Sequence, residues 1–317
     1  MATFNGDAFL KQQLDSICMQ DGSWHLIIRD DGSTDLTAEI LSSYKRIHGN
    51  ISVITDQFGN QGACCNFNKL LIEAEKVTSN QYFLLADQDD VWEWDKLKKQ
   101  LTLMKCMEKK HPDQAILIHS DLAVVDQDLN TIDLSMMRYQ GIQHEPLKPL
   151  NVLLTHNFVT GCTILMNRRL LEFALPMPAD ALMHDWWLAL CAAVFGHIGY
   201  IDQPLVKYRQ HDRNEVGAKH VNEFLNPLSK VFQKRWVEGK INLFKSMKQA
   251  QVLAERIREH DPENQHLALV EEYASLQYLS PMQRLFRLQK LGVHAQSSIR
   301  QALLLSRLFF ASRVRDV

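Results

Sequence analysis

Short β-branched runs alternate with helical periods over the first 122 residues, and this alternation limits the fold more than any other feature. Apolar residues recur at helical spacing from Phe9 to Ile17, ahead of the first run. The runs that are typical of strands lie at residues 25–28, 51–55, 81–86 and 116–119. Strands that alternate with helices are typical of a parallel sheet covered by helices. We therefore predict an α/β fold for this part of the chain.

The composition excludes several classes of protein. The 317 residues carry 35 Lys and Arg against 37 Asp and Glu, a net charge of -2 that argues against a surface dedicated to nucleic acid. The six cysteines include no C-x-x-C pair, so we expect reduced thiols and a cytoplasmic protein. No apolar run approaches the ~20 residues that cross a bilayer. We expect a soluble protein, or one peripheral on the inner face of the cytoplasmic membrane.

Polar clusters follow three of the predicted strands. They occupy residues 30–35, 56–62 and 87–90. Open parallel sheets bind ligands outside the carboxyl ends of their strands. The sequence therefore predicts that these clusters converge on one rim of the sheet and line a ligand site.

The acidic cluster at residues 87–90 predicts a divalent cation. Residues two apart in an extended segment share a side, so Asp87 and Asp89 can approach one ion, and oxygen ligands suit Mg or Mn. Such an ion would neutralise a departing pyrophosphate. The alternative is a set of acids at the start of the helix predicted after Val91, where Asp is common.

A second acidic cluster holds Asp30 and Asp31 directly after a strand. A cap for the helix that begins near Leu36 can come from Ser33, Thr34 or Asp35. Capping does not require the carboxylates of Asp30 and Asp31. Their oxygens are suited to accept hydrogen bonds from a base or from ribose hydroxyls. We predict that this cluster contacts a nucleotide.

The ordered motifs resemble those of family 2 glycosyltransferases with the GT-A fold, and most closely the bacterial rhamnosyltransferase-like enzymes of polysaccharide assembly. The resemblance spans about residues 1–217 and lies in the following segments: Thr3-Phe4-Asn5-Gly6, Asp30 to Asp35, Asn60-Gln61-Gly62, Asn66-Phe67-Asn68, Asp87 to Trp92, Thr160-Gly161-Cys162, His184 to Trp187, and Tyr208 to His211. It implies a Rossmann-like mixed sheet flanked by helices. It also implies an inverting transfer from a nucleoside-diphosphate sugar to a glycan or lipid-linked acceptor.

The resemblance also implies roles for residues on the donor side. Thr3 and Asp31 would contact the base, with Asn5 and Asp30 in the same donor-binding group. Asp87 would contact the ribose and, with Asp89 and His211, would hold Mn or Mg. Because Ala63-Cys64-Cys65 contains no Arg or Lys, we expect the ion, with Arg209 or Arg213, to neutralise the diphosphate.

On the acceptor side the resemblance assigns Asp185 as the base that deprotonates the acceptor hydroxyl, a role that needs an ionised carboxylate. The residues assigned to the acceptor pocket are Trp92, Gly161, Cys162, Trp186 and Trp187. Ordinary core packing of at least one of the paired tryptophans is the alternative. Without the resemblance, Asp185 would be a helix N-terminal acid and His211 a structural histidine.

The chain is expected to divide near residue 220. Residues 1–220 form the GT-A domain, with a donor half at about 1–122 and an acceptor half at 123–220. In the acceptor half we expect a strand at 159–166, a helix at 185–195 and a strand at 200–206. Residues 221–317 carry helical signals and form a C-terminal helical region, with one apolar stripe from Leu243 to Ile257 and another from Leu267 to Tyr278.

The two ends of the chain carry further expectations. Relatives begin with an apolar strand before the Thr3 segment, so we expect that first strand to be missing and the natural protein to begin upstream. Residues 281–317 hold seven basic residues against one acid, with apolar residues between them. This segment is suited to an anionic membrane near a lipid-linked acceptor, or to packing as a helix with a solvated basic face.

Two other functions remain open from the sequence. His184-Asp185 and His211-Asp212 mimic the His-Asp pairs of metal-dependent phosphohydrolases, which would require an all-helical domain. A catalytically degenerate glycosyltransferase-like module that binds a sugar or nucleotide is the non-enzymatic alternative.

Overall fold

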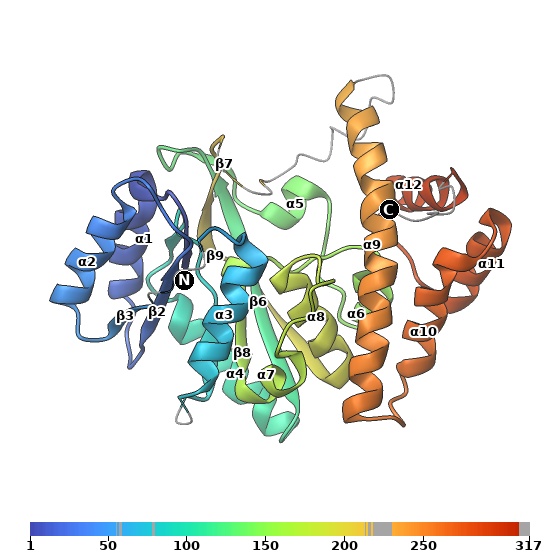
Figure 1. Cartoon of the computed structure of the whole chain (residues 1–317), viewed down its shortest axis with the longest axis horizontal. Helices are drawn as coiled ribbons and strands as arrows, with labels where there is room; N and C mark the ends of the chain where they lie inside the picture. Colours follow the sequence, from blue (N-terminus) through green and yellow to red (C-terminus); the bar gives the residue numbers. More distant parts are fainter. Residues whose placement is uncertain are drawn as a thin grey trace.

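The computed structural model describes residues 1–54, 56, 59–77, 80–212, 214, 217 and 230–310. Figure 1 shows the helices and strands of residues 1–54 on one side of a long central strand pair and the C-terminal helices on the other. The segment with Arg213 and the end of the basic tail from residue 311 lie outside the described residues.

The first sheet is parallel and has the strand order β1-β2-β3. Its strands are β1 (Ala2–Thr3), β2 (Leu26–Asp30) and β3 (Ile51–Ile54), and α1 (Asp7–Cys18) and α2 (Thr37–Ile47) connect them. The helix predicted from the spacing of apolar residues is confirmed, because Leu10, Leu14 and Ile17 of α1 are buried. The parallel α/β pattern is therefore correct for this part of the chain.

The second sheet is mixed and runs in the order β4-β8-β6-β9-β5, with β7 on the edge of β6. Its strands are β4 (Tyr82–Leu84), β5 (Val91–Trp92), β6 (Ala115–Val125), β7 (Thr131–Asp133), β8 (Leu165–Asn167) and β9 (Gly196–Arg209). β6 and β9 pair in parallel along most of their length, and every residue of β6 is buried. A Cβ at Gly196 would lie 1.8 Å from the Ala115 carbonyl oxygen, so glycine permits this close pairing.

Six helices cover this sheet among the described residues, and the segment before β8 contributes to the site. They are α3 (Ala63–Glu75), α4 (Lys96–Lys110), α5 (Met136–Gln140), α6 (Pro149–Leu153), α7 (Arg168–Ala174) and α8 (His184–Phe195). The expected strand at residues 159–166 is wrong over most of its length. A short 3-10 helix at Gly161–Thr163 precedes β8 instead, because Thr163 donates its hydroxyl to the Thr160 carbonyl and the Asn157 side chain binds both backbone groups of Val159.

The expectation that the first strand is missing needs correction, since Ala2–Thr3 pairs with Arg29 and Asp30 of β2. The α-amine of Met1 donates to the Ile27 carbonyl at 2.7 Å, and burial lowers the pKa of this amine to about 5. Residues of β2 and β4, among them Leu26, Ile27 and Phe83, line a void of about 260 Å³ beside it. The two sheets are thus separated by an apolar gap on this side of β2.

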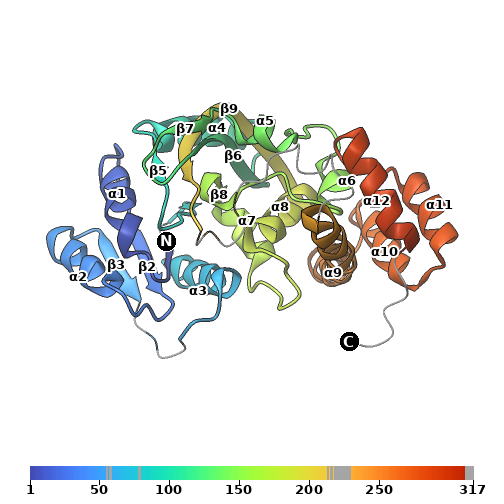
Figure 2. The same ribbon diagram turned by 90° about the horizontal axis from the view of Figure 1, so that it is seen from above.

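The C-terminal helices pack on the α/β part through a shared core (Figure 2). They are α9 (Lys230–His260), α10 (Leu267–Ser275), a 3-10 turn at Leu276–Tyr278, α11 (Pro281–Leu291) and α12 (Ser298–Phe310). The apolar stripe of α9 is confirmed as buried, whereas Tyr278 is 67% exposed because the helical phase changes at the 3-10 turn. Among the described residues, no helix combines the length and apolar character needed to cross a membrane.

Candidate active site

A cavity of about 830 Å³ lies where the polar clusters converge. Its walls come from β1, the loops after β2, β3 and β4, the segment before β8, the start of α8 and one face of α9. The predicted site residues on its wall are Thr3, Asp31, Asp87, Asp89, Gly161, Asp185 and Trp186. The strand-end clusters therefore converge as predicted, but from the edges of two sheets and not from one rim of a single sheet.

Asp31 joins two of the converging loops. Its Oδ2 accepts hydrogen bonds from the backbone amides of Gln61 at 2.7 Å and Gly62 at 2.9 Å, and its Oδ1 lies 2.6 Å from the Arg29 guanidinium. Asp31 and Arg29 are both almost fully buried. Gly62 has a φ of +80°, which favours glycine at this turn. The ion pair and the two amides fix the loop after β3 over the end of β2.

Two predicted donor-binding residues, Asp30 and Asn5, hold neighbouring loops and do not line the cavity. Asp30 accepts from the hydroxyls of Thr3 at 2.9 Å and Ser33 at 2.6 Å. The Asn5 side-chain oxygen accepts from the Thr34 amide at 2.8 Å. Their oxygens are used within the protein because the loop after β2 must turn back over β1. Their assignment to direct donor contact is not supported by this placement.

The acidic loop after β4 is tied to β1 by Gln88. The Gln88 side chain accepts from the Phe4 amide at 2.8 Å and donates to the Phe4 carbonyl at 2.9 Å. A Cβ at Gly6 would lie 2.2 Å from the Gln88 side-chain oxygen, so a larger residue there would displace this bond. The paired hydrogen bonds hold Asp87 and Asp89 at the same rim as Thr3.

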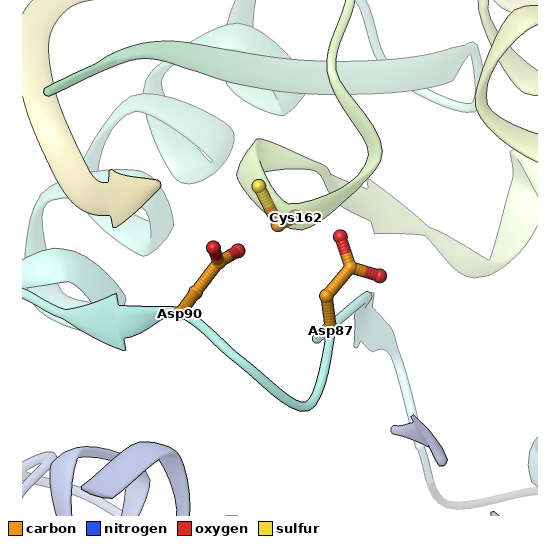
Figure 3. Close-up of side chains that lie close together, drawn as sticks. All are labelled: Asp87, Asp90 and Cys162. Carbon is orange, nitrogen blue, oxygen red and sulfur yellow. The ribbon is translucent and has the colours of Figure 1, made fainter. Parts of the chain in front are cut away.

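Asp87, Asp90 and Cys162 place their ligand atoms within 4.8 Å of one another (Figure 3). Burial, and then the nearby carboxylates of Asp89 and Asp87, hold the pKa of Asp90 well above its ordinary range. Burial also raises the pKa of the Cys162 thiol. One carboxylate oxygen of Asp90, Oδ2, is buried with no hydrogen-bond partner among the described residues. A positive charge at this position would satisfy that oxygen and reverse the shift.

Asp89 lies with His211 in a separate pair. The His211 Nε2 is 2.9 Å from Asp89 Oδ2, and the imidazole stacks on Phe9. The three predicted metal ligands are thus divided in the described structure, with Asp89 beside His211 and Asp87 beside Asp90 and Cys162. His211 itself does not line the cavity.

Arg209 does not face the diphosphate position expected from the sequence. It is buried, its Nε donates to the Asp89 carbonyl at 2.8 Å, its Nη2 donates to the Gln12 side chain at 2.6 Å, and its Nη1 donates to the Gln127 carbonyl. Its guanidinium also lies over the Phe9 ring. Because these groups use its donors, Arg209 positions the backbone of Asp89, a role the sequence did not indicate.

Asp185 stands at the first turn of α8 and faces the cavity. Its Oδ2 accepts from the Gly161 amide at 3.1 Å, which joins α8 to the turn before β8. Burial raises the pKa of Asp185 to about 6, against the lowering effect of hydrogen bonds from Trp186, Gly161 and Asn157. A carboxyl group with a pKa near neutrality is suited to exchange a proton with a bound hydroxyl.

The predicted acceptor residues divide between the cavity and the core. Trp186 lines the cavity and donates its indole N–H to the Leu153 carbonyl at 2.6 Å. The assignments of Trp187, Cys162 and Trp92 to the acceptor wall need correction, because the first two are fully buried and Trp92 is 8% exposed inside the protein. Trp187 donates to the Ala174 carbonyl at 2.9 Å, as expected of a core tryptophan.

Two residues on the cavity wall come from the helical region after residue 230, namely Asn242 and Lys245 of α9. Both stand on the polar face of the helix, opposite the buried stripe that contains Leu243 and Met247. Neither belongs to a motif, and their place on that polar face is the one sequence signal that points to them.

The mixed sheet, the acidic loop at the strand ends and the facing carboxylate place the chain among α/β proteins with a polar cavity at the strand ends. Residues 1–173 match the profile of Glycosyl transferase family 2. The chain therefore belongs to glycosyltransferase family 2.

Relatives and solved structures agree with this membership. The chain is similar to the dTDP-rhamnosyl transferase RfbG of Shigella flexneri, with 28% identity over 69% of this chain and 74% of the relative. It is also similar to the putative teichuronic acid biosynthesis glycosyltransferase TuaG of Bacillus subtilis, with 28% identity over 65% of this chain and 76% of the relative. The fold resembles residues 1–349 of Staphylococcus aureus TarS in complex with UDP, with a TM-score of 0.51, 16% identity and coverage of 96% and 85%. The GT-A fold expected from the motifs is thus confirmed.

Proposed function

We propose that this glycosyltransferase moves a sugar, with rhamnose as the first candidate, from a nucleoside-diphosphate sugar to a glycan or lipid-linked acceptor in cell-surface polysaccharide assembly. The observation that carries the proposal is the shared cavity, which has Asp87 and Asp89 on one wall and Asp185 on another. The relatives named for rhamnosyl transfer and for teichuronic acid assembly support the choice of donor and pathway class.

Asp185 is the residue we assign as base. Its carboxylate faces the cavity, and its pKa of about 6 leaves it largely ionised at neutral pH while keeping it basic enough to accept a proton. It would remove the proton from the acceptor hydroxyl as that oxygen attacks the anomeric carbon from the face opposite the leaving diphosphate. A single displacement of this kind inverts the anomeric configuration.

The residues present also fit a divalent cation. Asp87 and Asp89 offer hard oxygen ligands at the cavity wall, His211 lies beside Asp89, and the unpartnered buried oxygen of Asp90 marks a place for positive charge. Asp87, Asp89 and His211 are the residues we propose to hold Mn or Mg. When bound, the ion would offset the charge that develops on the leaving diphosphate.

The rival functions have less support. A phosphohydrolase of the His-Asp type needs an all-helical domain, whereas the described chain contains two sheets. His184 is buried against the Phe67 ring at a centroid distance of 4.0 Å, and burial lowers its pKa to about 3. A binding module without catalysis would not need a carboxylate with a raised pKa on the acceptor wall.

The test is nucleoside-diphosphate release from a panel of nucleotide sugars, including dTDP-rhamnose, in the presence of Mn, with acceptor fractions from cell-envelope glycans. We expect transfer from one nucleotide sugar, loss of transfer with a chelator, and loss of Mn-dependent donor binding in Asp89→Ala. Asp21→Ala is the matched control, because Asp21 is exposed and does not line the cavity. Donor binding that survives both chelation and Asp89→Ala would contradict the metal assignment, and absence of transfer from every donor would contradict the function.

A further inference from the structure

The carboxylates in the cavity create a charge problem for a diphosphate. Asp31, Asp87, Asp89 and Asp185 all line the wall, and a nucleoside diphosphate adds further negative charge. A divalent cation at Asp87 and Asp89 offsets the negative charge of groups close to it, because charge interactions weaken with distance and with solvent screening. The cavity therefore needs a second positive group for any ligand that carries a diphosphate.

The cations near the acidic loop do not supply that charge. Arg29 is buried between Asp31 and Asp56. The guanidinium of Arg209 donates hydrogen bonds to the Asp89 carbonyl, the Gln12 side chain and the Gln127 carbonyl. Neither residue lines the cavity. Among the described residues, Lys245 is the one Lys or Arg that does.

The position of Lys245 is set by the packing of α9. One turn further along the helix, Gln249 is buried and its side chain accepts from the Leu182 amide at 2.8 Å, three residues before Asp185. Leu243, Ser246 and Met247 are buried on the other side of the same turn. This arrangement presents Lys245 to the cavity from the acceptor wall, beside Leu182 and Met183.

Lys245 is exposed and has no ion pair with another described residue. A lysine held on a fixed helix face, at a cavity whose wall also holds four carboxylates, and without an ion pair to another described residue, has its ammonium available for a ligand. We propose that Lys245 binds a diphosphate group in this cavity, so that the C-terminal helical region completes the substrate site. The inference rests on the proposed function, which supplies the diphosphate.

Two substrates carry this chemistry. One is the nucleoside diphosphate of the donor, and the other is the diphosphate of a lipid-linked acceptor. Both present the same oxygens to an ammonium, and charge-assisted hydrogen bonds of this type account for about a tenfold change in affinity. The two sources separate when the ligands are measured one at a time.

The experiment compares wild type with Lys245→Ala, Lys245→Arg and Lys248→Ala by calorimetry with dTDP, UDP, thymidine and inorganic pyrophosphate, each with Mn. Lys248 is an exposed lysine on the same helix that does not line the cavity, so its removal changes the net charge equally. We expect Lys245→Ala to weaken the binding of a nucleoside diphosphate or of pyrophosphate about tenfold. We expect Lys245→Arg to retain most of the affinity, and Lys248→Ala and the binding of thymidine to stay unchanged.

A second arm measures the KM for a prenyl-diphosphate-linked acceptor. A higher acceptor KM in Lys245→Ala, with unchanged nucleoside-diphosphate binding, assigns the lysine to the acceptor diphosphate. Equal binding and equal KM in wild type and Lys245→Ala would overturn the proposal. Wild-type protein that binds no nucleoside diphosphate at all would instead contradict the proposed function, and pyrophosphate binding would still report on Lys245.

Discussion

The donor wall and the acceptor wall of the cavity hold their carboxylates in different ways. On the donor wall, Asp31 is buried, paired with Arg29 and bonded to two backbone amides. On the acceptor wall, Asp185 is partly exposed and has a pKa raised to about 6. The first environment fixes a carboxylate whose hydrogen bonds shape a loop. The second leaves a carboxyl group that can exchange a proton near neutral pH. Asp31 is thus suited to position a loop, and Asp185 is suited to act as a base.

The largest effect that tests this difference is expected from Asp185→Asn. The amide keeps the shape of the side chain and removes the proton acceptor, so turnover should fall by roughly two or more orders of magnitude. Donor affinity and the melting temperature should stay near the wild-type values. Transfer kinetics and calorimetric donor binding, measured on the same variant, check both parts.

Asp180→Asn is the matched control for that variant, because Asp180 is an exposed carboxylate shortly before α8. It should transfer sugar at the wild-type rate. Wild-type turnover in Asp185→Asn would move the base to Asp212, or to Asp180 if the Asp180→Asn variant loses turnover. A large loss of stability in Asp185→Asn would instead favour a helix-capping role.

On the donor wall the expected loss is one of stability. Asp31→Ala leaves the Arg29 charge with a single carboxylate partner and removes the acceptor of the Gln61 and Gly62 amides. Breaking a buried pair of this kind destabilises a protein by about 3 kcal/mol. Urea denaturation should show this change, whereas Glu73→Ala, which breaks an exposed pair with Lys76, should cost less than about 1 kcal/mol. Equal stability of the two variants would contradict a structural role for Asp31.

Much of the fold follows from local sequence signals. The helix Asp7–Cys18 and the strands β2 and β3 have clear periodicity, so their burial patterns match the expectation. The sequence predicts a strand through the turn at Gly161–Thr163 because β-branched residues flank it at Val159, Thr160 and Ile164. The hydrogen bonds of Asn157 and Thr163 decide its conformation, and side chain to backbone bonds of this kind leave no periodic pattern.

The candidate site was predicted less completely than the fold. Motif order predicted that Thr3, Asp31, Asp89 and Asp185 would share one cavity. They do, because the ends of β1, β2 and β4, from both sheets, meet the start of α8 there. Motifs did not distinguish Trp186 from Trp187, since helical phase against a third element decides which of two neighbours is buried. Lys245 lies outside the motifs, and only the packing of α9 on α8 brings it to the site.

The raised pKa of Asp185 predicts how both activity and stability depend on pH, which tests the difference between the two walls. The base must be ionised, so kcat/KM should fall about tenfold per pH unit below about 6 and level off above it.

The raised pKa of Asp185 also affects stability, because the folded state binds this proton more tightly than the unfolded state. The stability gained from the proton is present below the unfolded pKa of about 4 and is lost as pH rises through about 6. Above pH 6, Asp185→Asn should therefore match or exceed wild type in melting temperature, and a lower value at pH 7.5 would contradict the assignment.

The basic tail carries the smallest expected effect. Four of its seven basic residues bind the protein itself, and one of them, Arg287, forms an exposed ion pair with Glu272 at 3.2 Å. Arg284 is buried and donates to the Leu276 carbonyl at 3.1 Å, and the guanidinium groups of Arg300 and Arg307 donate to the backbone carbonyls of Gln140 and Arg235. These contacts agree with the packed-helix alternative. They leave fewer basic residues of this segment available to contact a membrane.

The surface we propose for membrane contact lies on α11, where Met282 is 67% exposed and Phe286 is 69% exposed one turn later, with Lys290 beyond them. Apolar residues beside a lysine are suited to the surface of an anionic bilayer. The double variant Met282→Ser with Phe286→Ser should reduce co-flotation with phosphatidylglycerol vesicles a few-fold, and should leave flotation with phosphatidylcholine vesicles at background. Met19→Ser with Ile47→Ser removes equally exposed apolar residues at the ends of α1 and α2, helices that lie far from α11 in Figure 1, and should change nothing. Flotation that is the same in all three proteins would exclude α11 as the contact. Because the lysine acts through screened charge, the wild-type signal should also weaken as salt is raised from low to physiological concentration.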